Sequence, residues 1–133
     1  DEIQLKLITA RDAEEIFAFV DRSRQYLREW LGWVDATKTV DDCRSFAIMN
    51  LKKFANDEAL DTAIIYKGQF VGKISINTID WTSKTAEIGY FLDESFQGSG
   101  IMTRAAKGIL DIAFTQYMLD KVEIHAAEDN LKS

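Results

Sequence analysis

Hydrophobic and polar residues alternate at the start of the chain. Ile3, Leu5 and Leu7 are separated by Gln4 and Lys6, so apolar side chains recur at every second position. Side chains of a strand point alternately to its two faces, and this period therefore predicts a half-buried strand over residues 3–8.

Two helices are predicted after this strand, each opened by a capping box. Thr9 is followed three residues later by Asp12, and Thr39 is followed in the same way by Asp42. In such a box the hydroxyl and the carboxylate each bind a backbone N–H of the first helical turn. Helical spacing then continues to about residue 21 in the first helix and to about residue 55 in the second. The expected apolar positions are Ala13, Ile16, Phe17 and Val20 in the first and Cys43, Phe46, Ala47 and Phe54 in the second.

A series of strands follows the second helix. Residues 62–66 and 70–79 are rich in β-branched side chains, and Lys67, Gly68 and Gln69 between them predict a hairpin turn. Residues 80–84 predict a second turn. Residues 85–92 are nearly continuously apolar after Glu87, which indicates a strand that is buried on both faces.

The last two elements form the strongest pattern in the chain. Apolar residues at helical spacing predict a helix that ends near Tyr117, and residues 121–126 predict a final strand with Val122, Ile124 and Ala126 facing the core. The apolar residues of the helix are Ile101, Met102, Ala105, Ala106, Ile109, Leu110, Ile112, Ala113 and Phe114. The order β-α-α-β-β-β-α-β predicts a mixed α/β fold whose last strand-helix-strand unit is a parallel crossover.

Composition narrows the function classes. A chain of 133 residues with 47% hydrophobic residues has the size of one domain. Its net charge of −6 argues against a general nucleic-acid binder, and no apolar run has the length of a membrane span. A single cysteine excludes an internal disulfide and favours a reduced, cytoplasmic setting; with one histidine, it also argues against a structural zinc site.

A glycine-containing loop joins the strand that ends at Leu92 to the last helix. Gly98 and Gly100 allow the backbone to turn its N–H groups in one direction, and the helix start adds unpaired N–H donors and partial positive charge. Together these features predict an anion site that suits a phosphate or pyrophosphate. The Walker sequence is absent, and Thr103 stands where the dinucleotide fingerprint requires its third glycine.

The pattern Gln97-x-x-Gly100, which follows the strand and precedes the last helix, resembles motif A of the GNAT acetyltransferases, Gln/Arg-x-x-Gly-x-Gly/Ala. Met102 stands where that motif has its last Gly or Ala. The bulkier methionine is expected to alter helix–sheet packing. The order of elements is also that of the family. Residues 86–103, the aromatic segment 26–33 and the pair Asn130 and Ser133 are similar to the Rim-type branch, the ribosomal-protein N-terminal acetyltransferases.

The resemblance covers essentially the whole chain. It implies one GNAT acetyltransferase domain over residues 1–133, with the α/β (α+β) acyl-CoA N-acyltransferase fold, a mixed central sheet and flanking helices. Family members continue after the Asn-x-x-Ser motif with a helix and a pair of strands. We therefore expect that this final helix and strand pair are missing from a domain incomplete at its C-terminus.

The resemblance also implies site residues. Glu87 would be a base that acts through water, and Ser133 would protonate the departing thiolate. Leu92 would offer its backbone to the acetyl-pantetheine arm, and Asn130 would contact the pantetheine region. The residues expected to wrap the pyrophosphate, mainly through backbone N–H groups, are Gln97, Gly98, Ser99, Gly100, Ile101, Met102 and Thr103.

Several residues allow a purely structural interpretation. Glu87 could be a structural carboxylate paired with a lysine, and Cys43 is expected to be a small apolar residue of its helix. His125 is expected on the solvent side or in a second layer around the site, and not as a base. Tyr26, Trp30 and Trp33 are expected to pack in the core or line the groove, and Arg104 and Lys107 to lie on an exposed helix face, where either could also meet a 3′-phosphate.

The function implied is acetyl-CoA-dependent transfer to a primary amine, most simply a protein N-terminal α-amine such as that of a ribosomal protein. No metal, nucleic acid or membrane is implied, and a homo-oligomer is left open. Two alternatives remain: an acetyltransferase for a small amine, such as a polyamine or an antibiotic, and a non-catalytic acyl-CoA-binding module.

Overall fold

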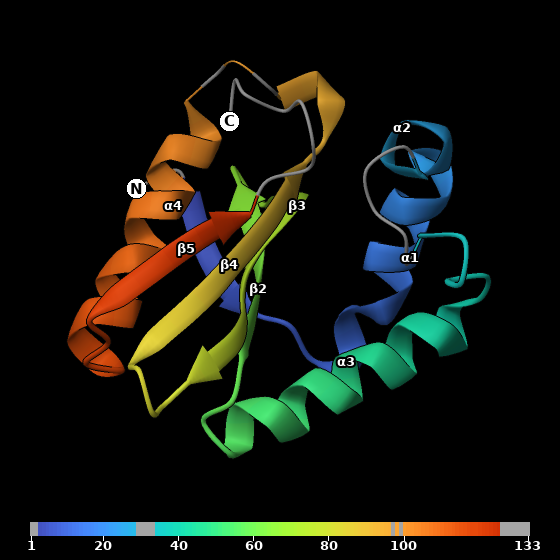
Figure 1. The fold of residues 1–133 in the computed structure, drawn as a ribbon. Helices are drawn as coiled ribbons and strands as arrows, with labels where there is room; N and C mark the ends of the chain where they lie inside the picture. Colours follow the sequence, from blue (N-terminus) through green and yellow to red (C-terminus); the bar gives the residue numbers. More distant parts are fainter. Residues whose placement is uncertain (1–2, 29–33, 97, 99, 126–133) are drawn as a thin grey trace.

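The computed structural model of the chain describes residues 3–28, 34–96, 98 and 100–125 (Figure 1). The elements follow the expected order, with short helical turns between them. In chain order they are β1 (Ile3–Leu7), η1 (Ala10–Asp12), α1 (Ala13–Arg22), α2 (Arg24–Arg28), α3 (Val40–Ala55), β2 (Leu60–Tyr66), β3 (Gln69–Asp80), β4 (Thr85–Leu92), η3 (Glu94–Phe96), α4 (Ile101–Asp111), η4 (Ile112–Gln116) and β5 (Lys121–His125).

The strands form a five-stranded mixed sheet in the order β1-β2-β3-β4-β5. β1 to β4 pair antiparallel, and β5 pairs parallel to β4. The hairpin between β2 and β3 has Tyr66 paired with Gln69, so its turn consists of Lys67 and Gly68, with φ of 52° and 82°. Two consecutive positive φ angles match the twist of the flanking strands, which explains why glycine occupies the second turn position.

Both capping boxes are confirmed. The Asp12 carboxylate accepts the backbone N–H of Thr9 at 2.8 Å, and the Thr39 hydroxyl accepts the N–H of Asp42 at 3.1 Å. The first box opens η1 and leads directly into α1, and the second opens α3. These local bonds satisfy N–H donors that a helix start otherwise leaves unpaired.

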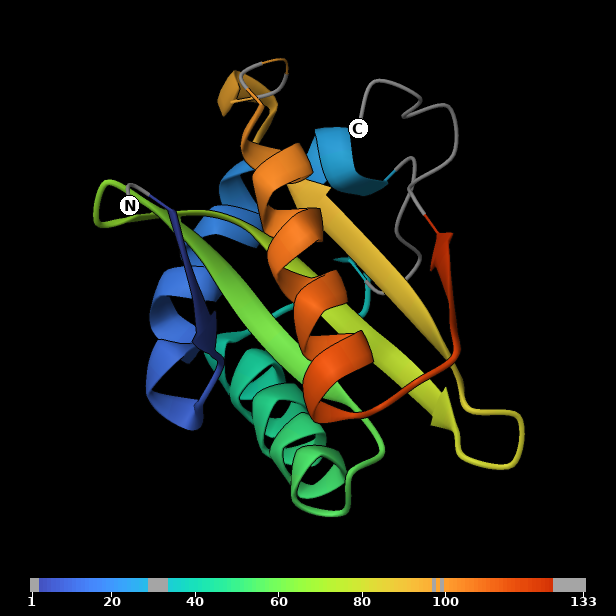
Figure 2. The ribbon, with the colours of Figure 1, turned by 90° about the vertical axis from the view of Figure 1, so that its left-hand side faces the viewer.

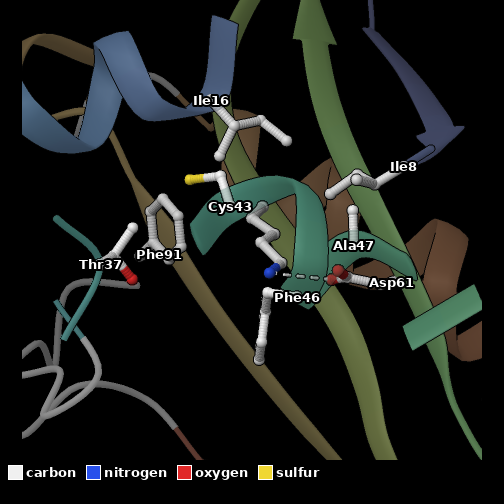
Figure 3. Close-up of a pocket in the computed structure, with 9 residues that line it drawn as sticks. Ile8, Ile16, Thr37, Cys43, Phe46, Ala47, Asp61 and Phe91 are labelled. Atoms are coloured by element: carbon white, nitrogen blue, oxygen red, sulfur yellow. Dashed lines mark ion pairs between the residues drawn. The ribbon is translucent and has the colours of Figure 1, made fainter. Parts of the chain in front are cut away.

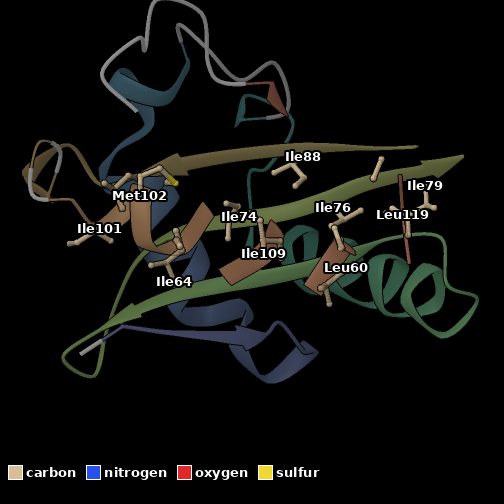
Figure 4. Packing of buried hydrophobic residues seen from close by; sticks show 14 of the residues in the cluster. Leu60, Ile64, Ile74, Ile76, Ile79, Ile88, Ile101, Met102, Ile109 and Leu119 are labelled. Atoms are coloured by element: carbon tan, nitrogen blue, oxygen red, sulfur yellow. The ribbon is translucent and has the colours of Figure 1, made fainter. Parts of the chain in front are cut away.

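Helices cover both faces of the sheet. α4 lies on one face, whereas α1 and α3 lie on the other (Figures 1 and 2). The α4 side contains the larger core, in which the side chains of Ile74, Ile88 and Ile109 are completely buried (Figure 4). The opposite side contains a second core around Phe19, whose ring lies 5.2 Å from that of Phe70 and 5.6 Å from that of Phe91. β4 is therefore covered by the α4-side core on one face, but on the other face it is buried only at Phe91, so the predicted burial on both faces holds only at its carboxyl end.

Three large apolar side chains are more exposed than the sequence pattern predicts. Ile124 is 50% exposed because α4 packs against β1 and β3 and does not cover β5. Phe114 is 43% exposed, since the chain changes from α4 to the wider π-helical turn η4 and the helical period shifts. Phe46 is 40% exposed, and its ring lies over the Lys73 ammonium at 4.9 Å. Val122 is partly buried against the α4-side core, as predicted.

Candidate active site

The glycine-containing loop lies between the carboxyl end of β4 and the start of α4. Gly98 and Gly100 both have φ of 82°, a left-handed conformation that L side chains rarely adopt. Apart from the glycine itself and its chain neighbours, no atom of the described residues lies within 4 Å of the place where either residue would carry a Cβ. The backbone therefore turns next to open space, and a phosphate group could approach it closely. Gln97 and Ser99, expected in the same loop, lie outside the described residues.

The first turn of α4 supplies the donors of this cradle. Gly100 is the N-cap residue, and no side chain caps this end of the helix among the described residues. Ile101 and Met102 are buried in the α4-side core, whereas Thr103 is exposed. Ile101 and Met102 could thus contribute only their backbone N–H groups to an anion, and Thr103 could add its hydroxyl. Unpaired N–H groups and the helix dipole both favour negative charge here.

β4 carries the features expected for a thioester arm. Its pairing with β5 runs from Thr85 to Gly89 in the described residues, and β4 continues past that pairing to its carboxyl end at Leu92. Leu92 pairs with Gly72 of β3, and its side chain is buried on the α4 side. Its backbone is therefore the part of Leu92 that a ligand at the end of this strand could reach.

Glu87 lies on the opposite face of β4 from Leu92. Along the strand Ala86, Ile88 and Leu92 belong to the α4-side core, whereas Phe91 belongs to the core under α1 and α3. Glu87 alternates with the first group and thus shares the face of Phe91. It is half-buried, and its partners in the sheet are Thr78 of β3 and Glu123 of β5. Asn130 and Ser133, expected beside this strand, lie outside the described residues.

A pocket opens on the same face of the sheet, between the strands, α1 and α3 (Figure 3). Its volume is about 370 Å³, including the solvent space at its mouth. Its lining is largely apolar, but it contains the Lys73 ammonium 3.2 Å from the Asp61 carboxylate. Asp61 also accepts hydrogen bonds from the Ser75 hydroxyl and from the Asn50 amide.

Comparison with known proteins identifies the family. The family model described as an acetyltransferase (GNAT) domain matches residues 2–133. The chain belongs to the GNAT acetyltransferases. It is therefore an N-acetyltransferase, and its mixed sheet with flanking helices is the fold of that family.

Curated relatives of this GNAT domain carry names that agree with the Rim-type resemblance. YdaF of Bacillus subtilis (strain 168), named for a ribosomal N-acetyltransferase activity, is 30% identical over 100% of this chain and 73% of its own length. The ribosomal-protein-serine acetyltransferase of Escherichia coli (strain K12) is 26% identical over 100% of this chain and 74% of its own length.

A solved structure shows the same arrangement of elements with ligands bound. It is that of the microcin C7 self-immunity acetyltransferase MccE in complex with acetyl-CoA and AMP. It is 32% identical, covers 99% of this chain and 73% of that chain, and has a TM-score of 0.89.

The other residues singled out in the sequence lie in different parts of the acetyltransferase. Cys43 lines the pocket, and burial raises the pKa of its thiol, as expected for an apolar role. Arg104 and Lys107 are exposed on α4. Tyr26 packs against the core under α1 and α3. Trp30 and Trp33 lie outside the described residues, and His125 is placed only as the last residue of β5.

Two exclusions apply to the described part of the acetyltransferase. No group of three or more His, Cys, Asp or Glu side chains there could hold a metal ion. None of the helices described has the length and apolar character that a membrane span needs.

Sequence reasoning missed the polar cluster in the pocket. Asp61 follows Leu60 at the start of β2, and Lys73 and Ser75 stand at alternate positions of β3, on either side of Ile74. Polar residues at every second position of a buried strand lie on the same face, and buried polar groups need hydrogen-bond partners. This pattern could have indicated that these side chains contact one another. It could not show which partner each would have, because that depends on the register of β2 against β3.

Proposed function

We propose that this N-acetyltransferase transfers the acetyl group of acetyl-CoA to the α-amine of a protein N-terminus, such as that of a ribosomal protein. The observation that carries the proposal is the arrangement along β4. The strand leads from the carboxylate of Glu87, through its carboxyl end at Leu92, to the glycine turn and the start of α4, which no described side chain caps. The names of the curated relatives support the choice of acceptor.

The cradle would hold acetyl-CoA by its pyrophosphate. Gln97, Gly98, Ser99, Gly100, Ile101, Met102 and Thr103 form this part of the site in the proposal. The pantetheine arm would follow the backbone at Leu92 and contact Asn130. A backbone N–H at this strand end would polarise the thioester carbonyl, since a fixed dipole aimed at developing negative charge stabilises the transition state.

The acceptor amine attacks the thioester carbon directly in a ternary complex. A C–N bond forms, the C–S bond breaks, and coenzyme A leaves as a thiolate. Glu87 takes the proton lost by the amine through a water molecule, and the Ser133 hydroxyl gives a proton to the thiolate. Solvent then returns a proton to Ser133 and takes one from Glu87 before the next turnover. Because no covalent acyl-enzyme is formed, holding the two substrates in the right orientation supplies much of the acceleration.

The pKa of the acceptor favours an α-amine. An α-amine has a pKa near 8 and a lysine a pKa near 10.4, so deprotonating the lysine at neutral pH costs about 3 kcal/mol more. A half-buried glutamate that acts through water is a weak base. It is therefore better matched to an α-amine, whose deprotonation at neutral pH costs less free energy than that of a lysine.

A small-molecule amine, such as a polyamine or an antibiotic, is the acceptor of the second candidate function. The 32% identity to a self-immunity acetyltransferase that binds AMP supports it. Both candidates share the site, the donor and the chemistry, and they differ in what is attached to the amine.

Release of coenzyme A thiol, with mass spectrometry of the product, would separate the candidates. The panel contains a peptide with a free N-terminus and blocked lysines, the same peptide with a blocked N-terminus and free lysines, and a polyamine. We expect the first peptide to be acetylated fastest. Preferential acetylation of the polyamine would favour the second candidate, and acetylation of the lysines alone would contradict both.

A further inference from the structure

β3 carries one extra residue opposite Glu87. Ile76 pairs with Ile88, and the next recorded pair is Thr78 with Glu87, so the register shifts between Ile76 and Thr78 and Asn77 is inserted. In such a bulge two residues of one strand oppose a single residue of the other. Asn77 and Thr78 therefore both stand across from Glu87.

The bulge places both polar side chains on the face of Glu87. Ile76 and Ile79, on either side, are buried in the α4-side core. Asn77 and Thr78 are exposed. A regular strand would have directed one of these two residues into that core. Because of the inserted residue, the side chains of Ile76 and Ile79 both stay in the α4-side core, and those of Asn77 and Thr78 both lie on the opposite face.

Gly89 makes room for the Asn77 side chain. A Cβ on Gly89 would lie 2.6 Å from Asn77 Nδ2, closer than real Cβ contacts come. Gly89 stands between Glu87 and Phe91 on one face of β4, so its missing side chain would point to that face. The Asn77 carboxamide thus occupies the space directly over Gly89, between Glu87 and the end of the strand.

The carboxamide is placed to bind a ligand there. It offers an acceptor oxygen and two N–H donors. Among the described residues, Asn77 has no side-chain hydrogen bond, so these atoms are not used within that part of the protein. Gly89 is two residues from Glu87 along β4, which is about 7 Å of strand, so a ligand bound over Gly89 lies next to the Glu87 position on the same face.

We propose that Asn77 positions the acceptor by binding the carbonyl next to its amine. Nδ2 donates to that carbonyl oxygen, and the amine then lies between Glu87 and the Leu92 end of the strand. The inference rests on the proposed function and deepens it. The acceptor class becomes an amine with a neighbouring carbonyl, as in a peptide or an aminoacyl compound, and a simple alkylamine becomes a poor acceptor.

The test compares four variants with two acceptors. The variants are Asn77→Ala, Gly89→Ala, the double variant and Gln69→Ala, an exposed control at the other end of β3. The acceptors are a short peptide with a free N-terminus and an alkylamine without a carbonyl. For the peptide, Asn77→Ala should lower kcat/KM about fivefold to tenfold, mainly through KM, because one hydrogen bond is lost. For the alkylamine, kcat/KM should not change.

Gly89→Ala should reproduce this loss, since its methyl group displaces the flexible end of Asn77. In the double variant there is no carboxamide to displace, so the second substitution should cause no further loss. Gln69→Ala should match the wild type with both acceptors, and all variants should keep the wild-type thermal midpoint.

Three results would overturn the inference. One is an equal loss with both acceptors, another is a peptide kcat/KM that Asn77→Ala leaves unchanged, and the third is independent losses that add in the double variant. In these cases the wild-type enzyme still transfers acetyl groups, and the proposed function survives. If the wild-type enzyme transfers to neither acceptor, the proposed function fails, and the inference fails with it.

Discussion

The Lys73 ammonium and the Asp61 carboxylate lie 3.2 Å apart on neighbouring strands, with 14% and 8% of their side chains exposed. Two charges removed from water in this way depend on each other, because either one alone would be left without compensation. The Ser75 hydroxyl and the Asn50 amide complete the shell of Asp61. The pair therefore ties β2 to β3 under α3, in the pocket next to the proposed site.

Removing one member of this pair should destabilise the protein strongly. We expect Lys73→Met to lower the free energy of unfolding by about 3 kcal/mol, since it leaves a buried carboxylate without its cation. Lys73→Met combined with Asp61→Asn should recover part of the loss. Urea denaturation measures both. Arg44→Met, which breaks an exposed pair with Asp41, is the control and should cost less than about 1 kcal/mol.

Gly100→Glu should abolish affinity for coenzyme A, because it adds bulk and negative charge at the proposed phosphate cradle. Gly68 offers a matched control: it has the same φ of 82°, and no described atom beyond its chain neighbours lies within 4 Å of its Cβ position, but it lies in the β2–β3 turn. Gly68→Glu should carry the same backbone strain and keep wild-type affinity. Calorimetric titration with coenzyme A distinguishes the two. Unchanged affinity in a folded Gly100→Glu variant would contradict the assignment of the loop.

Glu87→Gln should lower turnover near neutral pH and leave the affinity for acetyl-CoA nearly unchanged. Raising the pH should restore part of the rate, because a larger fraction of the acceptor amine is then already neutral. Glu123→Gln, on the adjacent position of β5, is the control and should retain the wild-type pH–rate profile. If Glu123→Gln shows the loss and Glu87→Gln does not, the base has been assigned to the wrong strand.

The two capping carboxylates should make stability fall in acid. Backbone N–H donors, that of Lys38 foremost, lower the pKa of Asp42. Burial acts to raise the pKa of Asp12, but the hydrogen bonds from Lys6 and Thr9 outweigh it and leave that pKa lowered. A lowered native pKa contributes stability above the ordinary value of 3.8, and this contribution is lost as the pH falls through the native value.

Thermal midpoints measured from pH 6 down to about pH 2 would test this. Asp42→Asn and Asp12→Asn should each be less stable at pH 6 and should show a smaller decrease in acid. Asp120→Asn, an exposed carboxylate outside both caps, should follow the wild-type curve. If the thermal midpoint of either capping variant falls in acid as steeply as that of the wild type, the role assigned to that carboxylate is wrong.

Features that depend on neighbouring residues were predictable from the sequence. Thr9 with Asp12 and Thr39 with Asp42 form their caps within one helical turn. Gly98 and Gly100 marked a turn before α4 for the same reason, since left-handed backbone is a local property of glycine. The order of the elements and the parallel pairing of β5 followed from the periods of the apolar residues.

Features that depend on long-range packing were not predictable in this way. Ile124 alternates correctly with its neighbours, but its exposure depends on how far α4 extends across the sheet. Asn77 appears in the sequence as one polar residue in a strand. Its place over Gly89 depends on a bulge, and a bulge is a relation between two strands that the sequence of one strand does not display.

The three central strands are joined by short turns, and this connectivity has a consequence for the order of folding. β2, β3 and β4 form two consecutive hairpins. In contrast, β1 is separated from β2 by residues 8–59, and β5 is connected to β4 through α4. Loop closure over short distances is fast, so we expect the central meander to gain amide protection first in pulsed hydrogen exchange. Glu87, Asn77 and Gly89 would then be in register before the cradle exists. The acceptor side of the enzyme would be assembled early, and the ability to bind coenzyme A would mark the completion of folding.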